Sequence, residues 1–455
     1  MSSLIEKIRN NGKSYFIQTF GCQMNEHDSE TIAGMLEEMG YVESPSRDTA
    51  DIIVMNTCSV RENADNRFFG QLGIMKKVRE RRPGTVVAVC GCMMQQEHII
   101  RRLKEKYSWV DIIFGTMSIH EFPQLLKDCL DKKEKVMKIC QEQEKIIEGL
   151  PAHRKFKHKS FVNIMNGCNN FCTYCIVPYT RGRERSREPE EILAEIRGLV
   201  ADGVKEVTLL GQNVNSYGNG CGFGCDFAEL IRRINAIEGL ERIRFMTSHP
   251  KDLSDRLIAA FSDCEKLCHH IHLPVQSGSS EVLRRMNRHY TKEGYIDLVE
   301  RIRSAVPDIA LTTDIIVGFP GETEADFEDT LDLVRKVRFD SAFTFLYSVR
   351  TGTPAAEYED QIPEEVKHQR FERLVDTLNE ITAEKNALYQ NRTVEVLVEG
   401  ESARGEAGTW SGRTDTFKLV NFDCDRDLTG QLVNIRITDA KTFSLFGEVA
   451  DEKEL

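Results

Sequence analysis

The segment Cys168-Asn169-Asn170-Phe171-Cys172-Thr173-Tyr174-Cys175 places three thiols within eight residues. Thiolates are soft ligands that suit zinc or iron–sulfur clusters. Structural zinc usually takes four protein ligands, and no fourth Cys or His lies close to this segment. A [4Fe–4S] cube held by three thiolates leaves one iron free to chelate a small molecule. The spacing therefore predicts such a cluster, because three unpaired core cysteines would rarely adopt it by chance.

The residues around this segment are strongly basic, although the whole chain is acidic. The 455 residues carry a formal net charge of −12, whereas residues 151–187 contain eight Lys or Arg and one Glu, a net of +7. A basic segment favours a polyanionic partner at the cysteine site. The alternative is a solvated charged surface.

The cysteine content and the N-terminus predict a reducing compartment. The chain holds fourteen cysteines, and its first residues lack the long apolar stretch of a secretory signal. Reduced thiols and metal ligation are then more plausible than disulfides. No run of eighteen apolar residues occurs, so we expect no membrane span and a cytoplasmic protein.

Residues 13–130 alternate short apolar runs with helical stretches, which predicts parallel βα units and a small doubly wound α/β domain. The expected strands are 14–20, 51–56, 86–90 and 110–114, and the expected helices are near 26–39, 62–80, 94–106 and 119–131. Residues 131–150 are charged, have few core signals and are predicted to be a linker.

A second group of cysteines follows the first three of these strands. Cys22, Cys58 and Cys92 are far apart in sequence, but ligands of open parallel sheets collect outside the carboxyl ends of the strands. The topology therefore predicts a second three-thiolate site. The alternative is that these are buried cysteines acting as small hydrophobic residues. Cys90 competes with Cys92, which we favour because it lies further out at the strand end.

Residues 151–385 repeat the βα pattern and predict a partial (β/α)6 barrel, with its site at the carboxyl ends of the strands. The first cysteine segment follows the first strand and would lie at that mouth. The expected strands are 161–165, 206–211, 242–247, 271–274, 312–318 and 342–347; the expected helices are 189–201, 226–237, 253–262, 279–286, 291–304, 323–336 and a long polar one, 364–390.

Residues 388–453 change character and predict five short strands without helices. The expected strands are 393–398, 409–414, 416–421, 432–438 and 444–449. A small closed or OB-like β-barrel is a frequent nucleic-acid-binding form. From residue 388 to the end there are eight Lys or Arg against thirteen Asp or Glu. RNA contact would therefore be local, through Arg413, Lys418, Arg436 or Lys441, and a purely structural barrel is the alternative.

These motifs together resemble the methylthiotransferases of the radical S-adenosylmethionine superfamily, over essentially the whole chain. The family pattern is an N-terminal methylthiotransferase domain, a radical core and a C-terminal TRAM domain. The matching segments are Gln18–Asn25, Asn56–Cys58, Gly91–Cys92, Phe171–Gly182, Gly211–Gly218, His272–Gly278 and Gly412–Thr414. Segments 177–187, 211–218 and 272–278 favour the branch that acts on dimethylallyl-adenosine in tRNA.

The resemblance implies a specific reaction at position 37 of tRNA, in the anticodon stem-loop. N6-(dimethylallyl)adenosine would gain a methylthio group at C2. Cys168, Cys172 and Cys175 would hold the [4Fe–4S] cluster that cleaves S-adenosylmethionine, and Cys22, Cys58 and Cys92 an auxiliary [4Fe–4S] cluster. One S-adenosylmethionine would methylate sulfur on the auxiliary cluster, and a second would yield the 5′-deoxyadenosyl radical that removes hydrogen from C2.

Further contacts are predicted from strand ends and from the basic segment. Cofactor contacts are expected from Tyr174, Gln212, Gln276, Ser277 and Gly318. RNA contacts are expected from Arg181, Arg183, Arg185, Arg187, Arg413 and Lys418, with the terminal barrel nearby. The pairs Cys221/Cys225 and Cys264/Cys268 are interpreted as incidental. An electron donor such as flavodoxin or ferredoxin is implied, and a monomer is adequate.

Two kinds of alternative function are left open by these observations. The first is a methylthiotransferase for another target, either threonylcarbamoyl-adenosine in tRNA or a ribosomal protein. The second is a non-catalytic iron–sulfur protein that binds RNA. Production of 5′-deoxyadenosine under reducing, anaerobic conditions separates an enzyme from a binding module.

Overall fold

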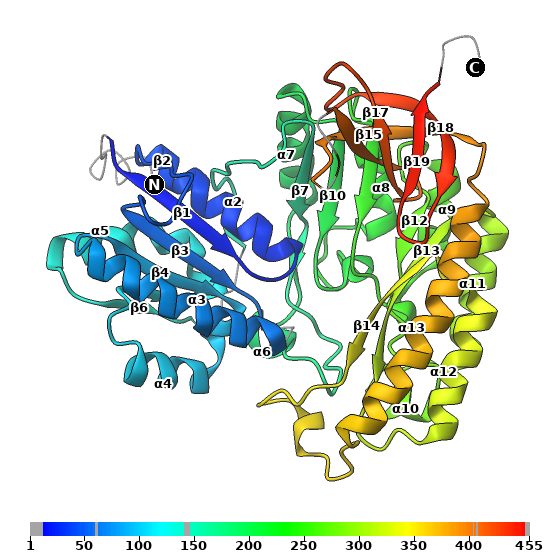
Figure 1. The fold of residues 1–455 in the computed structure, drawn as a ribbon, viewed down its shortest axis with the longest axis horizontal. Coiled ribbons are helices and arrows are strands. Elements are labelled where there is room, and N and C mark those ends of the chain that lie inside the picture. Colours follow the sequence, from blue (N-terminus) through cyan, green and yellow to red (C-terminus); the bar gives the residue numbers. More distant parts are fainter. Residues whose placement is uncertain (1–11, 60–61, 141–145, 404, 406–407, 451–455) are drawn as a thin grey trace.

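Three sheet systems follow one another along the chain (Figure 1). The computed structural model describes residues 12–59, 62–140, 146–403, 405 and 408–450. An N-terminal parallel sheet lies beside a central set of parallel strands, and a small β-barrel caps one end of that central set. The predicted α/β multidomain class, with its doubly wound domain, partial barrel and small β-barrel, is confirmed.

The N-terminal sheet is parallel throughout and is covered by helices on both faces. Strands β3 and β4 are buried at every position, as the inner strands of such a sheet must be. The strand order is β2 (Val42–Glu43), β1 (Ser14–Thr19), β3 (Ile52–Thr57), β4 (Val86–Gly91), β5 (Ile112–Phe114) and β6 (Val136–Lys138). The helices are α2 (Gln23–Glu38), α3 (Glu62–Arg81), α4 (Glu97–Lys106) and α5 (Phe122–Lys132), with short 3-10 turns η1 (Cys92–Gln95) and η2 (Thr116–Glu121).

The linker predicted at 131–150 is wrong in part. Strand β6 lies inside it and pairs in parallel with β5, with Val136 opposite Ile112 and Lys138 opposite Phe114. The first sheet therefore extends beyond residue 130. A three-residue edge strand ending in lysine carries too little apolar signal to be recognised, and charge on an edge strand is a common way to prevent further pairing.

The central region contains six parallel strands with helices outside them. The strands are β7 (Lys159–Asn163), β10 (Glu206–Leu210), β11 (Arg242–Phe245), β12 (His270–His272), β13 (Ala310–Val317) and β14 (Ser341–Leu346). They pair as two three-stranded parallel sheets, in the orders β11-β10-β7 and β12-β13-β14, over one contiguous core, and this arrangement agrees with the predicted partial barrel. The helices are α7 (Pro189–Ala201), α8 (Phe227–Asn235), α9 (Asp255–Asp263), α10 (Ser280–Arg285), α11 (Lys292–Ala305), α12 (Glu324–Val337) and α13 (Glu364–Ala387).

The terminal strands close into a barrel in the order β15-β16-β17-β19-β18. Strands β17 and β19 run parallel and the other neighbours antiparallel, and apolar side chains fill the interior. The strands are β15 (Thr393–Glu401), β16 (Thr409–Thr414), β17 (Leu419–Asp423), β18 (Leu432–Ala440) and β19 (Leu445–Val449). The third strand starts later than predicted because Phe417 adopts a positive φ of 67° in the turn before it.

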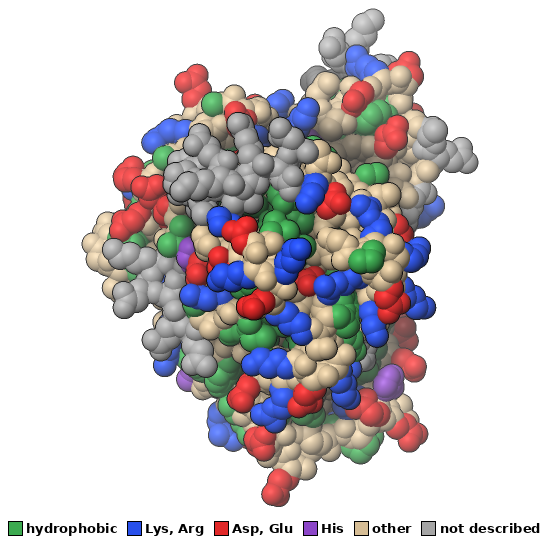
Figure 2. Space-filling model, turned by 90° about the vertical axis from the view of Figure 1, so that its left-hand side faces the viewer, with side chains coloured by type: hydrophobic (Ala, Val, Ile, Leu, Met, Phe, Trp, Pro, Cys, Tyr) green, Lys and Arg blue, Asp and Glu red, His purple; other side chains and the backbone are tan. Residues whose placement is uncertain are grey.

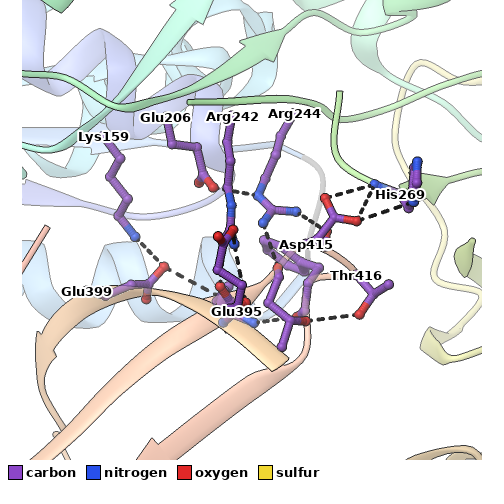
Figure 3. A network of polar contacts seen from close by, with 12 residues as sticks. Lys159, Glu206, Arg242, Arg244, His269, Glu395, Glu399, Asp415 and Thr416 are labelled. Carbon is purple, nitrogen blue, oxygen red and sulfur yellow. Dashed lines mark hydrogen bonds and ion pairs between the residues drawn. The ribbon is translucent and has the colours of Figure 1, made fainter. Parts of the chain in front are cut away.

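The terminal barrel docks on the amino ends of the central strands (Figure 3). Arg242 and Arg244, on β11, donate to the backbone oxygens of Arg413 (2.8 Å) and Thr414 (2.7 Å). Lys159 begins β7 and pairs with Glu399 at 2.6 Å. Since parallel strands all point the same way, this face lies opposite the mouth where Cys168 follows the first strand. The expectation that the terminal barrel lies near the cysteine segment is therefore wrong.

The N-terminal sheet and the central barrel are joined along helix α2 and the short helix α6 (Val177–Thr180). A Cβ on Gly34 would lie 2.6 Å from the backbone of Pro151, so only glycine allows α2 to approach this closely. The backbone N–H of His153 donates to the oxygen of Glu30 at 2.9 Å. Thr116 Oγ1 donates to the oxygen of Thr180 at 3.0 Å. Among the described helices, none is long and apolar enough to cross a membrane.

Candidate functional site

The first cysteine segment leaves a short two-stranded ribbon at the barrel mouth. Strand β8 (Met165–Asn166) pairs with β9 (Arg185–Ser186). Between β8 and Cys168 the chain turns at Gly167 (φ 82°), where a Cβ would lie 2.0 Å from the oxygen of Arg183. The cysteines then follow in an irregular loop, in which Phe171 has a positive φ of 46°. Non-glycine residues with a positive φ occur often at functional sites.

A second segment, residues 285–290, is hydrogen-bonded to the cysteine loop. Thr173 donates from its backbone to Met286 (3.1 Å) and from its hydroxyl to Arg285 (2.9 Å). Asn287 Nδ2 donates to the backbone oxygens of Asn170 and Phe171 at 3.1 and 3.2 Å. These hydrogen bonds fix the path of the cysteine loop.

The three thiols of the loop lie close enough to influence one another. Burial, together with the neighbouring Cys172, raises the pKa of Cys175 to about 12, and burial raises the pKa of Cys168 to about 11. Deprotonating them together needs a compensating cation, which a bound cluster provides. No group of three His, Cys, Asp or Glu among the described residues is arranged around a single ion. In a four-iron cube each thiolate binds a different iron, so three closely spaced thiols fit such a cluster.

Polar groups without partners line the ends of the neighbouring strands. Among the described residues, Asn213 Oδ1, Ser248 Oγ and His249 Nε2 are buried and make no hydrogen bond. They follow β10 and β11, where Thr247 also has a positive φ of 67°. Buried polar atoms normally have partners, so this mouth fits a polar ligand such as S-adenosylmethionine. Sequence reasoning missed all three; polar residues beyond each strand end were the available signal.

The predicted cofactor contacts divide into two groups. Tyr174 is half-buried beside Cys172 and Cys175, and Gln276 is buried with a φ of 71° at the mouth. Gln212 Oε1 accepts from the N–H of Gly167, so it supports the cysteine loop. Ser277 and Gly318 also have roles within the fold. Ser277 Oγ accepts from the N–H of Ser279, and Gly318 lies where a Cβ would meet the Lys367 side chain at 2.2 Å.

The second set of cysteines lies at the carboxyl ends of β1, β3 and β4. Cys58 is hydrogen-bonded to Cys22, and this bond, with the charge of Arg181, lowers the pKa of Cys22 to about 6. Cys22 Sγ donates to Asn25 Oδ1 at 3.3 Å. Cys92 begins η1, directly after Gly91. The topology thus brings together three thiols that are distant in sequence.

Cys90 and Cys92 have different surroundings. Cys90 is fully buried in the apolar core beneath α2, where burial raises its pKa well above the ordinary value. Cys92 instead contacts Arg181, which arrives from the central region. Of the two, only Cys92 lies where the N-terminal domain contacts the central barrel around Arg181. We call this contact region the seam.

Arg181 joins three segments that carry the two cysteine sets. Its Nη2 donates to Asp28 Oδ2 on α2 at 2.7 Å, and its Nε lies 3.3 Å from Cys92 Sγ. It follows α6, which itself begins two residues after Cys175. Arg181 is only 6% exposed. This conflicts with the prediction that it contacts RNA, because a buried guanidinium paired with a carboxylate is not accessible to phosphate.

The other predicted RNA contacts differ in exposure. Arg183 is exposed and lies over the Phe171 ring, 4.4 Å from its centroid. Arg185 is half-buried. Arg187 is buried in ion pairs with Glu148 and Glu195, so its predicted RNA contact also conflicts with the structure.

The two predicted RNA contacts on the terminal barrel already have partners within the protein. Lys418 is buried and pairs with Asp340 at 3.1 Å. Arg413 is half-buried, donates to the oxygen of Phe417 and lies over that ring. The interface with the central barrel therefore occupies Lys418, whereas Arg413 is held by contacts within the terminal barrel, including Glu399.

The remaining cysteine pairs differ in their surroundings. Cys225 and Cys264 belong to the apolar core, and Cys268 is buried beside Arg244. Cys221 is exposed on a loop. Within the described residues they form no metal-binding group.

A cavity of about 330 Å³ opens at the seam, between η1, α4 and the start of α6. Its lining includes Gln95, Arg101, Ile176 and Tyr179. Tyr179 is 48% exposed and meets Phe171 edge-on, with ring centroids 6.0 Å apart. Aromatic rings of this kind can stack on unpaired bases.

Comparison with known families divides the chain in the same three parts. Residues 162–334 match the Radical SAM superfamily, residues 14–115 match the family described as Uncharacterized protein family UPF0004, and residues 387–450 match the TRAM domain. Among solved structures, the radical S-adenosylmethionine methyltransferase TsrM from Kitasatospora setae shares the fold. Its TM-score is 0.55 at 13% identity, with 76% of this chain and 75% of that chain covered.

Curated relatives are similar over almost the entire length. A protein of Clostridium botulinum strain Hall is 58% identical over 434 residues, covering 95% of this chain and 96% of the relative. One of Alkaliphilus oremlandii is 55% identical, covering 99% and 96%. Both are named tRNA-2-methylthio-N(6)-dimethylallyladenosine synthase. With this identity and the three matching domains, the chain belongs to the tRNA-2-methylthio-N6-dimethylallyladenosine synthase family of radical S-adenosylmethionine enzymes, which use S-adenosylmethionine and a [4Fe–4S] cluster.

Proposed function

We propose that the chain is a tRNA methylthiotransferase with two [4Fe–4S] clusters. It converts N6-(dimethylallyl)adenosine at position 37 into its 2-methylthio derivative. Cys168, Cys172 and Cys175 hold the cluster that binds S-adenosylmethionine. Cys22, Cys58 and Cys92 hold the auxiliary cluster.

The observation that carries this proposal is the meeting of both cysteine sets at one seam. Arg181 contacts Cys92 and lies six residues after Cys175. One substrate base inserted at this seam would therefore have both sets within reach. The link through Arg181 supports two clusters that serve one substrate.

The chemistry at C2 is beyond any side chain, because that C–H bond is not acidic. When bound, the cluster and S-adenosylmethionine supply the one-electron chemistry that removes this hydrogen. The protein supplies placement. The segment 285–290 fixes the cysteine loop, Asn213 and Ser248 offer polar atoms to the cofactor, and Tyr179 offers a ring to an unstacked base.

Anticodon loops suit this entry because their bases are reached without opening a duplex. Arg183 and the half-buried Arg185 flank the mouth and would meet the backbone phosphates. Arg181, Arg187 and Lys418 act instead within the protein, as their ion pairs indicate.

The auxiliary site is tested by Cys58→Ala. This variant should still form 5′-deoxyadenosine from S-adenosylmethionine but lose the methylthiolated product, because only the second thiolate set is incomplete. Cys221→Ala, at an exposed cysteine outside both sets, is the control and should keep both activities. Retention of both activities by Cys58→Ala would show that the auxiliary site is misassigned.

The substrate is tested by mass spectrometry of tRNA nucleosides from a strain lacking the gene. Loss of the methylthio-dimethylallyl nucleoside alone is expected. Loss of the threonylcarbamoyl-adenosine derivative, or of a ribosomal-protein modification, would identify one of the other targets. Absence of 5′-deoxyadenosine from the anaerobic, reduced enzyme would leave an RNA-binding iron–sulfur protein.

The setting of the reaction follows from its chemistry. We infer a cytoplasmic monomer that receives electrons from a flavodoxin or ferredoxin, because each cofactor cleavage consumes an electron. Size-exclusion chromatography with light scattering tests the monomer. Substitution of chemical reductant by a reduced flavodoxin tests the donor.

A further inference from the structure

Each cysteine set has one buried arginine against a sulfur. Arg288 Nη1 lies 3.3 Å from Cys172 Sγ, and Arg181 Nε lies 3.3 Å from Cys92 Sγ. Their residues are only 4% and 6% exposed. Burying a guanidinium costs free energy unless its N–H groups are hydrogen-bonded. Both arginines therefore need partners within the protein.

The two arginines differ in how their charge is compensated. Arg181 pairs with the buried carboxylate of Asp28 at 2.7 Å. Arg288 donates to two neutral groups, the hydroxyl of Tyr290 at 2.8 Å and the oxygen of Pro274 at 2.9 Å. Within the described part of the chain, no carboxylate forms an ion pair with Arg288. Cys92 Sγ therefore lies beside an arginine whose charge is balanced by Asp28. Cys172 Sγ lies beside Arg288, whose positive charge no carboxylate of a described residue balances in an ion pair.

Arg288 lies in a turn that follows helix α10. Asn287 and His289, on either side, have positive φ values of 61° and 60°. Asn287 directly follows the C-cap of α10, where a left-handed residue often ends a helix, and His289 adopts the same conformation two residues later. The same segment holds the cysteine loop through Asn287 Nδ2, so guanidinium and sulfur are positioned together.

We propose that these two arginines set the reduction potentials of the two clusters apart. Arg288 raises the potential of the cluster on Cys168, Cys172 and Cys175, whereas Asp28 cancels the charge of Arg181 and leaves the auxiliary cluster lower. Reduction adds negative charge to a cluster, and hydrogen bonds to its sulfurs favour the reduced form. An electron then stays on the cluster that must cleave the cofactor. The inference rests on the proposed function, because it needs two clusters.

Both arginines are positioning residues, because they act through cysteine sulfurs. The test is a potentiometric titration followed by EPR on the full chain, reconstituted anaerobically in two backgrounds. One carries alanine at Cys22, Cys58 and Cys92, and the other carries alanine at Cys168, Cys172 and Cys175. Each background keeps a single cluster, so the potentials are measured separately.

In the first background Arg288→Gln should lower the potential, and Arg288→Lys, which keeps the charge, should stay near the parent. In the second background Asp28→Asn should raise the potential, because the Arg181 charge is uncovered. Arg284→Gln is the matched control: Arg284 is exposed and pairs with Glu281, and its substitution should change neither potential. The thermal midpoint of each apo variant shows whether it is folded.

An unchanged potential in Arg288→Gln or in Asp28→Asn would overturn the corresponding half of the proposal. So would weaker S-adenosylmethionine binding by Arg288→Gln at the parental potential, which would make Arg288 a cofactor contact. Iron content separates this from the proposed function. About four irons in the wild-type chain, instead of about eight, would refute the auxiliary cluster, while the first background would still decide the role of Arg288.

Discussion

His249 shows how the fold controls a single residue at the barrel mouth. Its Nδ1 accepts the backbone N–H of Lys251 at 3.3 Å, which places the remaining proton on Nε2. Burial, followed by the charge of Arg288, lowers the pKa of His249 to about 2. The imidazole is therefore neutral at any working pH and offers a donor to a ligand at this mouth.

The depressed pKa of His249 makes stability depend on pH. The unfolded chain binds a proton near pH 6.5 and the folded chain does not, so this group lowers the unfolding free energy as pH falls below 6.5. Relative to wild type, His249→Gln should gain roughly 1 kcal/mol between about pH 7.5 and 5.5. Chemical denaturation of the apo protein at both pH values measures this, and a difference that does not change with pH would contradict it.

At this scale the cysteines could be predicted and their partners could not. The local spacing of Cys168, Cys172 and Cys175 indicates a cluster without further information. Arg288 and His249 have no local pattern of their own. Their significance comes from contacts with residues more than thirty positions away, which sequence periodicity does not carry.

Strand ends position the auxiliary thiols, and β4 is the clearest case. Gly91 has a φ of 99°, and a Cβ there would lie 2.1 Å from the oxygen of Thr57. The chain can therefore leave β4 and present Cys92 beside Arg181 only if this residue is glycine. Strand β4 determines the direction in which the chain reaches Cys92, and Gly91 avoids a clash with the backbone oxygen of Thr57.

Substitution of this glycine should be costly. Gly91→Ala combines a strained backbone with a clash at Thr57 and should destabilise the fold by about 2–5 kcal/mol. It should also lower iron content toward one cluster. Gly73→Ala, in α3 where nothing lies within 4 Å of the added Cβ, should stabilise by about 0.5–1 kcal/mol. Thermal melts and iron assays compare the two, and equal effects would contradict the assignment.

Long, strongly patterned elements could be predicted, and short edge strands could not. Helix α7 and strand β16 have the bounds expected from their sequence. Strands β2 and β6 were missed because two or three residues of mixed polarity have no period to detect. Their pairing depends on a neighbouring strand that is already in place.

For the molecule as a whole, the terminal barrel and the cysteine mouth lie at opposite ends of the central barrel. Lys159, Arg242 and Arg244 bind the terminal barrel from the amino ends of their strands (Figure 3). On the side formed by the N-terminal sheet, acidic and basic side chains are interspersed (Figure 2). Among the described residues, the face of the molecule in this view therefore carries no patch of a single charge sign.

Salt dependence of tRNA binding distinguishes exposed from buried cations. Arg183→Ala should weaken binding and reduce the slope of log affinity against log salt by about 1, because one phosphate contact is lost. Lys418→Ala should leave that slope unchanged and instead destabilise the protein by about 1–3 kcal/mol, since Asp340 loses a buried partner. Filter binding at several salt concentrations measures both slopes. A reduced slope for Lys418→Ala alone would reverse this assignment.

Sequence alone determined the fold class, the three-part order and the cysteine spacing, because each depends on periodicity or on residues close together in the chain. The tertiary structure decided which cations face solvent, which cysteine of the pair at 90 and 92 lies at the seam, and on which end the last barrel docks. Those outcomes depend on burial and on contacts between distant segments. The sequence of residues 181–187 does not distinguish arginines that bind phosphate from arginines that form ion pairs within the protein. In this fold Arg181 pairs with Asp28 and Arg187 pairs with Glu195.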